Sequence, residues 1–194
     1  MIVKYAFLND VETSKIEDFL LSADETLKNH ISRYKKQDDL KRSALGYYLV
    51  TKAYKELAGS IAPPILFTDN GKPYFKNDNI HFSISHSNDL SVCALSDKEI
   101  GVDTEKIKAF NPKLIDRICL DEEKQYIGNS SERFFQIWTA KEAYSKLTGL
   151  GLSIGLKNIE VDIKNLEVQG KKLTIKTIGD YIISIVSDWI GSLG

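Results

Sequence analysis

Residues 52–59 read Lys-Ala-Tyr-Lys-Glu-Leu-Ala-Gly, and residues 142–149 read Glu-Ala-Tyr-Ser-Lys-Leu-Thr-Gly. Alanine, tyrosine, leucine and glycine coincide in register between the two segments. Each segment ends a long helical pattern, over about 37–58 and 131–148, and its closing glycine is placed to stop the helix. Chance can give a match this short, but the order of the elements that follow favours an internal duplication.

A strand-rich stretch follows each of the two helices. The expected strands are Ile65–Thr68, Ile80–Ser85 and Ser91–Ser96 in the first half, and Asn158–Ile163, Lys172–Ile178 and Tyr181–Ser187 in the second. The predicted fold class is therefore α+β, with two pseudo-twofold-related halves that each pack a long helix on a small antiparallel sheet. We expect an N-terminal half at 1–98 and a C-terminal half at 99–194, and a site at their seam would draw residues from both.

Composition excludes several classes of protein. The 194 residues carry a formal net charge of -1, which argues against a nucleic-acid or membrane-surface binder. Cys93 and Cys119 lie in unrelated contexts without metal-ligand or redox spacing, so we expect reduced thiols. The first residues lack the long apolar core of a signal peptide, and no apolar run could span a bilayer. We therefore expect a cytoplasmic protein with no nucleic-acid or membrane partner.

Two short segments bring carboxylates together. Asp103 and Glu105 lie two residues apart in an apolar run that is typical of a strand, so both project from one face. Trp138, Glu142 and Lys146 follow at four-residue steps along one stripe of the second helix. If strand and helix pack together, three carboxylates and a lysine converge. Hard oxygen ligands beside a fixed cation suit magnesium and a phosphate-bearing substrate.

Each of these features also has an ordinary structural interpretation. Alternating carboxylates on a strand commonly form a solvated face, and Glu142 with Lys146 is a standard helix-stabilising pair. The same ambiguity applies to three basic or polar features of the first half: a lysine in a rigid turn, a hydroxyl-imidazole tip on a strand, and an arginine on the first long helix. These are Gly71-Lys72-Pro73, Ser85-His86-Ser87 and Arg42.

Taken together and in order, the motifs resemble those of one enzyme family. The series runs Arg42, Gly71-Lys72-Pro73, Ser85-His86-Ser87, Gly101-Val102-Asp103-Thr104-Glu105 and Trp138-Thr139-Ala140-Lys141-Glu142-Ala143-Tyr144-Ser145-Lys146. It is similar to that of the 4′-phosphopantetheinyl transferases of the surfactin-synthetase-activating, holo-[acyl-carrier-protein] synthase-like type. The resemblance runs from about Tyr34 to Leu152. The fold of that family, a pseudo-twofold pair of halves on one chain, agrees with the repeat.

The resemblance implies a reaction and roles in it. The 4′-phosphopantetheine arm of coenzyme A would move to a serine of an apo acyl or peptidyl carrier protein, releasing adenosine 3′,5′-bisphosphate. Asp103, Glu105 and Glu142 would hold Mg²⁺. Glu142 would also be the general base toward the serine, directly or through water. Lys146 would stabilise the phosphate, with Lys141 a weaker candidate for contacting it.

The resemblance places the other end of coenzyme A on the first half. Arg42, Lys72 and His86 would contact its phosphates, chiefly the 3′-phosphate, and Ser85 would donate a hydrogen bond there. Pro73, within the turn from Gly71 to Tyr74, would lie against the adenine. The segment Lys106–Ile127 resembles the carrier-docking region. The expected assembly is a monomer with internal pseudo-dimer symmetry.

This sequence departs from the family pattern at two places. Leu150 stands where a glycine-flanked basic residue is frequent, and the basic cluster before the first long helix is thinned, with Lys28 followed by Asn29 and His30. Two other functions remain open: a magnesium-dependent phosphohydrolase or nucleotidyl enzyme that needs no protein acceptor, and a binding module for carrier protein or coenzyme A that has lost activity. Nothing in the sequence identifies the carrier or its pathway.

Overall fold

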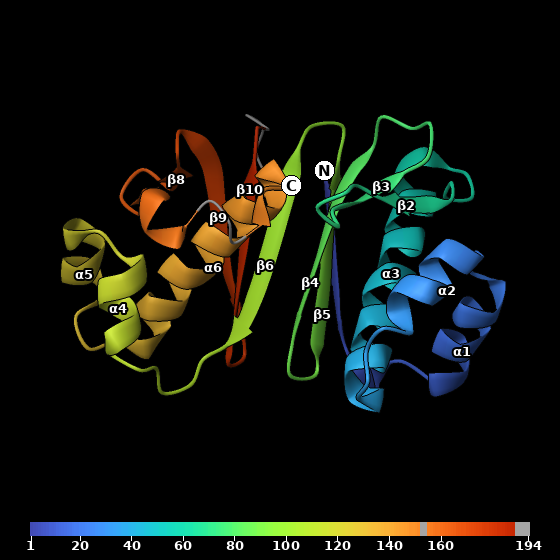
Figure 1. Cartoon of the computed structure of the whole chain (residues 1–194), viewed down its shortest axis with the longest axis horizontal. Coiled ribbons are helices and arrows are strands. Elements are labelled where there is room, and N and C mark those ends of the chain that lie inside the picture. Colours follow the sequence, from blue (N-terminus) through green and yellow to red (C-terminus); the bar gives the residue numbers. More distant parts are fainter. Residues whose placement is uncertain (152–154, 189–194) are drawn as a thin grey trace. The chain divides into compact units, whose positions relative to one another are not determined.

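The computed structural model describes residues 1–151 and 155–188, and the chain forms two compact units, Met1–Asp97 and Lys98–Gly194 (Figure 1). Each unit packs one long helix against an antiparallel sheet, which confirms the predicted α+β class. Among the described helices, none is both long enough and apolar enough to cross a bilayer.

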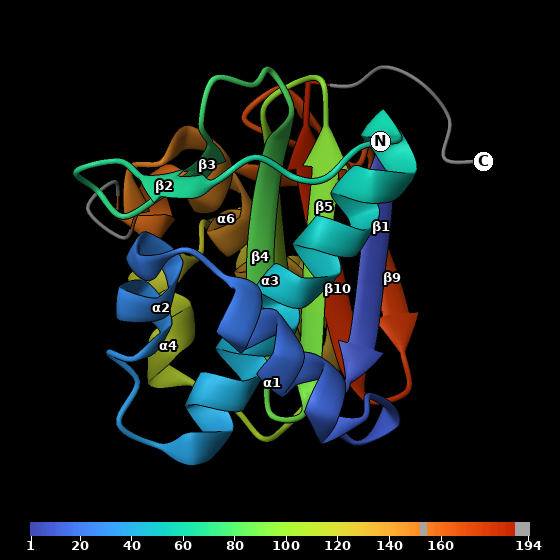
Figure 2. The same cartoon turned by 90° about the vertical axis from the view of Figure 1, so that its right-hand side faces the viewer.

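The first unit is built around helix α3 and a three-stranded sheet. Its elements are β1 (Ile2–Phe7), a 3-10 turn (Leu8–Asp10), α1 (Thr13–Ser22), α2 (Glu25–Ile31), α3 (Gln37–Ala58), β2 (Ile65–Phe67), β3 (Pro73–Phe75), β4 (His81–Ser87) and β5 (Leu90–Ser96). The sheet has the order β1-β5-β4, and β2 pairs with β3 in a separate hairpin. Figure 2 shows α3 lying across this sheet, with α1 and α2 beside it.

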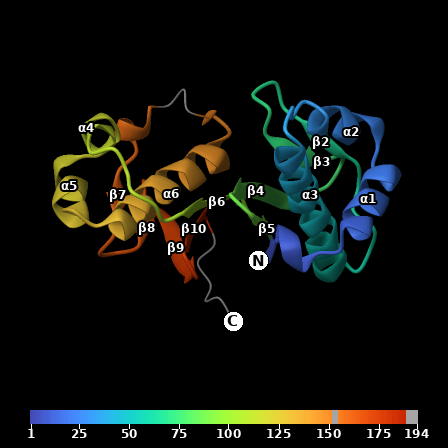
Figure 3. The same cartoon turned by 90° about the horizontal axis from the view of Figure 1, so that it is seen from below.

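The second unit is built around helix α6 and a five-stranded sheet. Its elements are β6 (Ile100–Lys106), α4 (Lys113–Ile118), α5 (Asp121–Ile127), α6 (Ser131–Thr148), a 3-10 turn (Leu156–Asn158), β7 (Val161–Asp162), β8 (Glu167–Val168), β9 (Lys171–Ile178) and β10 (Tyr181–Ser187). The sheet has the order β6-β10-β9-β8-β7. Figure 3 shows α6 along one face of this sheet, with α4 and α5 on the side of α6 away from β6.

The repeated segments form the last turns of α3 and α6. Both helices have the predicted bounds, and both end at a glycine in the left-handed region, Gly59 at φ +69° and Gly149 at φ +70°. A side chain would be strained there, so glycine is the residue that closes each helix. The alanine and tyrosine of the first copy, Ala53 and Tyr54, belong to the core of their unit.

The structure differs from the sequence prediction in its smaller elements. The expected strand at Asn158–Ile163 is instead the end of a 3-10 turn followed by the two-residue strand β7. Helices α1, α2, α4 and α5 were not predicted. They are six to ten residues long, and helices this short depend on packing more than on their own propensity.

Candidate functional site

A close approach between α6 and β6 positions the carboxylates of the second unit. A Cβ atom added at Gly101 would lie 1.9 Å from the carbonyl oxygen of Ala143 and 2.7 Å from the amide nitrogen of Leu147, so only glycine fits. Gly101 therefore faces the helix. Because side chains alternate along a strand, Asp103 and Glu105 project from the same face as Gly101. This contact explains why the strand motif begins with glycine.

Asp103 and Lys146 meet where strand and helix converge. The Nζ of Lys146 donates to Oδ1 of Asp103 at 2.8 Å, and Asp103 is buried whereas Lys146 stays about one third exposed. The predicted stripe is present on α6, since Trp138, Glu142 and Lys146 are all half-buried at four-residue steps. We call Asp103, Glu105, Glu142 and Lys146 the carboxylate–lysine cluster.

The environment of the cluster raises the pKa of Glu142. Burial, together with the negative charges of Asp103 and Glu105, raises its pKa to about 7 against the opposing effect of Lys146. The protonation of Glu142 therefore depends on the charges of the other three groups of the cluster. A carboxyl group with such a pKa exchanges its proton near neutral pH, which is where a general base is effective.

The carboxylate–lysine cluster contains three carboxylates of the kind that bind divalent cations. In residues 1–151 and 155–188, no three His, Cys, Asp or Glu side chains are grouped closely enough to form a ready metal site. The chemistry of the donors nevertheless fits magnesium, which prefers carboxylate oxygens, takes few protein ligands and keeps several waters. Asp103, Glu105 and Glu142 are the residues that would hold it. A cation among them would relieve the repulsion that raises the pKa of Glu142.

Lys141 plays a different part from the one predicted. Its side chain is completely buried, and Nζ donates to the carbonyl oxygens of Leu156 and Ile159 at 3.1 and 2.6 Å and to Oε2 of Glu123 at 2.7 Å. Glu123 in turn accepts from the amide of Val161. Lys141 thus has no exposed atom with which to reach coenzyme A. It joins α5 and α6 to the segment before β7.

The turn predicted to face adenine borders a cavity in the first unit. A space of about 600 Å³ is lined by Gly71 and Tyr74 on one side and by Asn29, His30 and Arg33 on the other. Within the turn, the amide of residue 72 donates to the Thr68 hydroxyl and its carbonyl accepts from the Thr68 amide. These bonds fix the backbone from which the predicted Lys72 and Pro73 extend.

Two residues of this cavity had no predicted role: Arg33 was not considered, and His30 was noted only beside Lys28 in the thinned basic cluster. The His30 ring stacks on Phe67 with centroids 3.9 Å apart, and burial together with the charge of Arg33 lowers its pKa. Arg33 is an exposed cation at the wall. The only signal in the sequence was the i, i+3 spacing of the two residues, which places them on one helical face but does not indicate what faces them. The expected Lys28 donates instead to the carbonyl of Leu21.

Two further predicted residues, Ser85 and His86, lie on β4. His86 is half-buried, and its ring makes an edge contact with Tyr34 at 6.2 Å between centroids. Ser85 is buried and, as the adjacent residue of a strand, projects to the opposite face from His86. Alternation therefore separates the two side chains that the sequence prediction had paired.

Arg42 connects α3 to the turn between β4 and β5. Its Nη1 donates to the carbonyl oxygen of Asn88 at 2.6 Å, and Nη2 forms an ion pair with Asp39. The Arg42 carbonyl accepts from the hydroxyl of Ser91. A guanidinium has five donors, so these contacts leave donors for a phosphate. They also give Arg42 a structural role in its own unit.

Comparison with known proteins identifies the family. Residues 99–186 match the family model described as 4′-phosphopantetheinyl transferase superfamily, and residues 12–98 match the one described as 4′-phosphopantetheinyl transferase, N-terminal. The chain belongs to the 4′-phosphopantetheinyl transferase superfamily. The first match contains the carboxylate–lysine cluster, and the second contains the cavity beside the Gly71–Tyr74 turn.

Three curated relatives carry the name 4′-phosphopantetheinyl transferase. The protein gsp of Aneurinibacillus migulanus is 34% identical over 67% of this chain and 57% of its own length, and psf-1 of Bacillus pumilus is 35% identical over 62% and 55%. A relative from Bacillus subtilis is 30% identical over 75% of this chain and 69% of its own length. The chain thus spans little more than half the length of the first two.

Proposed function

We propose that this chain transfers the 4′-phosphopantetheine group of coenzyme A to a serine of an apo acyl or peptidyl carrier protein, in a magnesium-dependent reaction that releases adenosine 3′,5′-bisphosphate. The convergence of the carboxylate–lysine cluster on one face of β6 and α6 carries this proposal. Family membership supports it, because the relatives are named for this transfer.

The roles of the cluster follow from its chemistry. Magnesium held by Asp103, Glu105 and Glu142 would bind the pyrophosphate and offset its repulsion of the carboxylates. Glu142 accepts the proton of the carrier serine, directly or through a water, because it is the carboxylate that α6 adds to the strand pair Asp103 and Glu105. Lys146, held by Asp103, supplies a fixed positive charge to the phosphate oxygens as negative charge develops there.

The adenylate end of coenzyme A is assigned to the first unit. The cavity beside the Gly71–Tyr74 turn has the size of a small-ligand site, and Arg33 adds a cation to its wall. Lys72, His86 and Arg42 are proposed to contact the 3′-phosphate, as the family resemblance implies. Ser85 is retained only as a weaker candidate, because it projects from the other face of β4.

Further parts of the proposal concern partners and compartment. We assign carrier docking to the segment Lys106–Ile127, which contains α4 and α5, and we propose that the protein acts as a monomer. We place the reaction in the cytoplasm. Cys93 and Cys119 are buried free thiols, which agrees with a reducing compartment.

The experiment is incubation of the protein with coenzyme A, Mg²⁺ and purified apo carriers from fatty-acid, polyketide and nonribosomal-peptide systems. Mass spectrometry should show a gain of about 340 Da on one carrier, the mass of the transferred arm. Asp103→Asn should abolish the gain, whereas Glu167→Gln, which changes an exposed carboxylate on β8 outside the docking segment, should retain it. Release of phosphate or nucleotide without any acceptor would favour the hydrolase interpretation, and coenzyme A binding without transfer to any carrier would favour an inactive binding module.

A further inference from the structure

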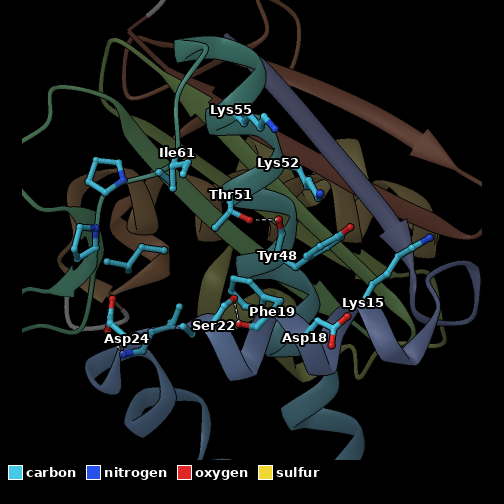
Figure 4. Close-up of a pocket in the computed structure, with 16 residues that line it drawn as sticks. Lys15, Asp18, Phe19, Ser22, Asp24, Tyr48, Thr51, Lys52, Lys55 and Ile61 are labelled. Atoms are coloured by element: carbon cyan, nitrogen blue, oxygen red, sulfur yellow. Dashed lines mark hydrogen bonds between the residues drawn. The ribbon is translucent and has the colours of Figure 1, made fainter.

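The first unit contains a second cavity that the proposed transfer does not use. It is a pocket of about 700 Å³ on the outer side of α3, bordered by α1, the start of α2 and the linker from α3 to β2 (Figure 4). This volume is typical of sites that enclose a small organic ligand. We call it the α3 pocket.

The walls of the α3 pocket are mainly apolar. Apolar side chains from all the bordering elements contribute, namely Phe19, Leu27, Tyr48, Ala62, Pro63 and Ile65. The Phe19 and Tyr48 rings meet edge to face with centroids 6.0 Å apart, and both remain half-buried. Ile61 also lines the pocket and is 90% exposed. Apolar surface left open in this way favours an occupant with an apolar chain.

The two aliphatic hydroxyl groups of the pocket, on Thr51 and Ser22, are already engaged within their own helices. Thr51 donates to the carbonyl oxygen of Tyr48 at 2.8 Å, and Ser22 donates to that of Phe19 at 2.9 Å (Figure 4). These internal bonds reduce the capacity of both hydroxyls to hold a polar ligand group. Polar recognition in the pocket therefore depends mainly on charged side chains.

Two lysines provide positive charge on the α3 side of the pocket. Lys52 and Lys55 lie three residues apart on one helical face. The ammonium group of Lys52 lies 5.2 Å from the centroid of the Tyr48 ring, and neither lysine forms an ion pair with a residue in the described part of the chain. Both are exposed, and Figure 4 shows them extending from the same stretch of α3 as Thr51 and Tyr48.

The carboxylates of the pocket lie on other elements. Asp24 accepts from the amide of Leu27 as the N-cap of α2, and Asp18 belongs to α1 together with Lys15, which is paired with Glu12. In Figure 4 Asp18 is drawn on α1 and Asp24 at the start of α2, both away from the stretch of α3 that carries Lys52 and Lys55. The pocket is thus polarised, with its unpaired positive charges at the α3 side.

We propose that the α3 pocket binds an aliphatic carboxylate, with the hydrocarbon chain against Phe19 and Tyr48 and the carboxylate between Lys52 and Lys55. Apolar walls supply affinity for the chain, and two adjacent cations supply the selection for a negative head group. The inference does not depend on the transfer reaction, since none of these residues belongs to the proposed site.

Decanoate is the probe, titrated into the whole chain below its micelle concentration and followed by amide shifts in NMR spectra. The shifts should saturate and centre on Tyr48, Lys52 and Ile61. Decyltrimethylammonium, which has the same chain and the opposite charge, should bind at least ~10-fold more weakly because two cations repel its head group. Equal binding of the two ligands would overturn the assignment of the head group.

The double variant Lys52→Ala/Lys55→Ala should weaken the binding of decanoate by about 10-fold. It should change the binding of a neutral decyl glycol ether by less than about twofold. A matched control, Lys35→Ala/Lys76→Ala, removes the same charge from exposed positions of the same unit outside the pocket and should change decanoate binding by less than about twofold. All four lysines are exposed, so folding should be retained. If the two double variants lost affinity equally, or if shifts spread over the surface without saturating, the proposed site would be wrong.

Discussion

Glu142→Gln should remove most of a pH-dependent loss of stability from the metal-free protein. Burial and the charges of Asp103 and Glu105 raise the pKa of Glu142 from 4.5 to about 7 in the folded state. Between these two values the folded protein retains a proton that the unfolded chain has released. Stability therefore falls as pH rises through this window, and it levels off above about pH 7.

The size of the effect follows from the same pKa difference. Each pKa unit corresponds to about 1.36 kcal/mol, so the full window would cost ~3 kcal/mol at high pH. Because Glu142 is only half-buried and solvent screens part of its charge, we expect a measured value of about 1–2 kcal/mol. Glutamine has the same size and no charge, so the variant and the parent should have similar stability near about pH 5 and differ near about pH 8.

Urea unfolding in the presence of a chelator, at several pH values, measures this difference in the free energy of unfolding. Glu122→Gln is the control, because it removes a carboxylate that is exposed on α5. Added Mg²⁺ should stabilise the parent more than the Glu142→Gln variant at high pH, since a ligand stabilises the state that it binds. Parallel pH profiles for the parent and Glu142→Gln would refute the raised pKa of Glu142.

The remaining predictions concern packing and roles. Gly101→Ala should cost about 3–5 kcal/mol by urea unfolding, because its Cβ would meet the Ala143 backbone at 1.9 Å; a change under about 1 kcal/mol would contradict the close approach. Lys141→Ala should cost about 3–5 kcal/mol by leaving a buried carboxylate without its cation, while calorimetry should show unchanged coenzyme A affinity in the folded protein. In kinetics with one carrier, Lys146→Ala should lower turnover more than binding, and Arg42→Ala should mainly weaken binding; the reverse pattern would exchange their roles.

The main elements could be predicted from the sequence because their signals are local. The bounds of α3 and α6 follow from the helical period and the closing glycine, and β10 follows from a run of apolar, mostly β-branched residues interrupted by Ser184. The short helices could not be predicted, since α4 and α5 owe their stability to contacts distant in sequence, such as the hydrogen bond that the amide of Val161 donates to Glu123.

The candidate site was predictable only in part, because some of its contacts join residues that are distant in sequence. The spacing of Asp103 and Glu105 and that of Glu142 and Lys146 determines which side chains share a face. Spacing cannot reveal that the neighbouring Lys141 turns inward, because its buried partner Glu123 lies 18 residues earlier in the chain. Lys141 and Lys146 look equivalent as lysines of one helix, and only the packing of α6 distinguishes the buried one from the one at the cluster.

The two units bring helix and strand together through glycine in different ways, and this difference explains where the cluster is built. In the first unit the glycine is on the helix, where a Cβ at Gly46 would meet only the side-chain methyl of Ile84, at 2.6 Å. In the second unit the glycine is on the strand, and the backbone of α6 packs directly against Gly101. A strand glycine leaves the helix free to carry large side chains at the contact. Lys146 therefore reaches Asp103 two residues along the same strand face, so the close packing and the charged site arise from one interaction between β6 and α6.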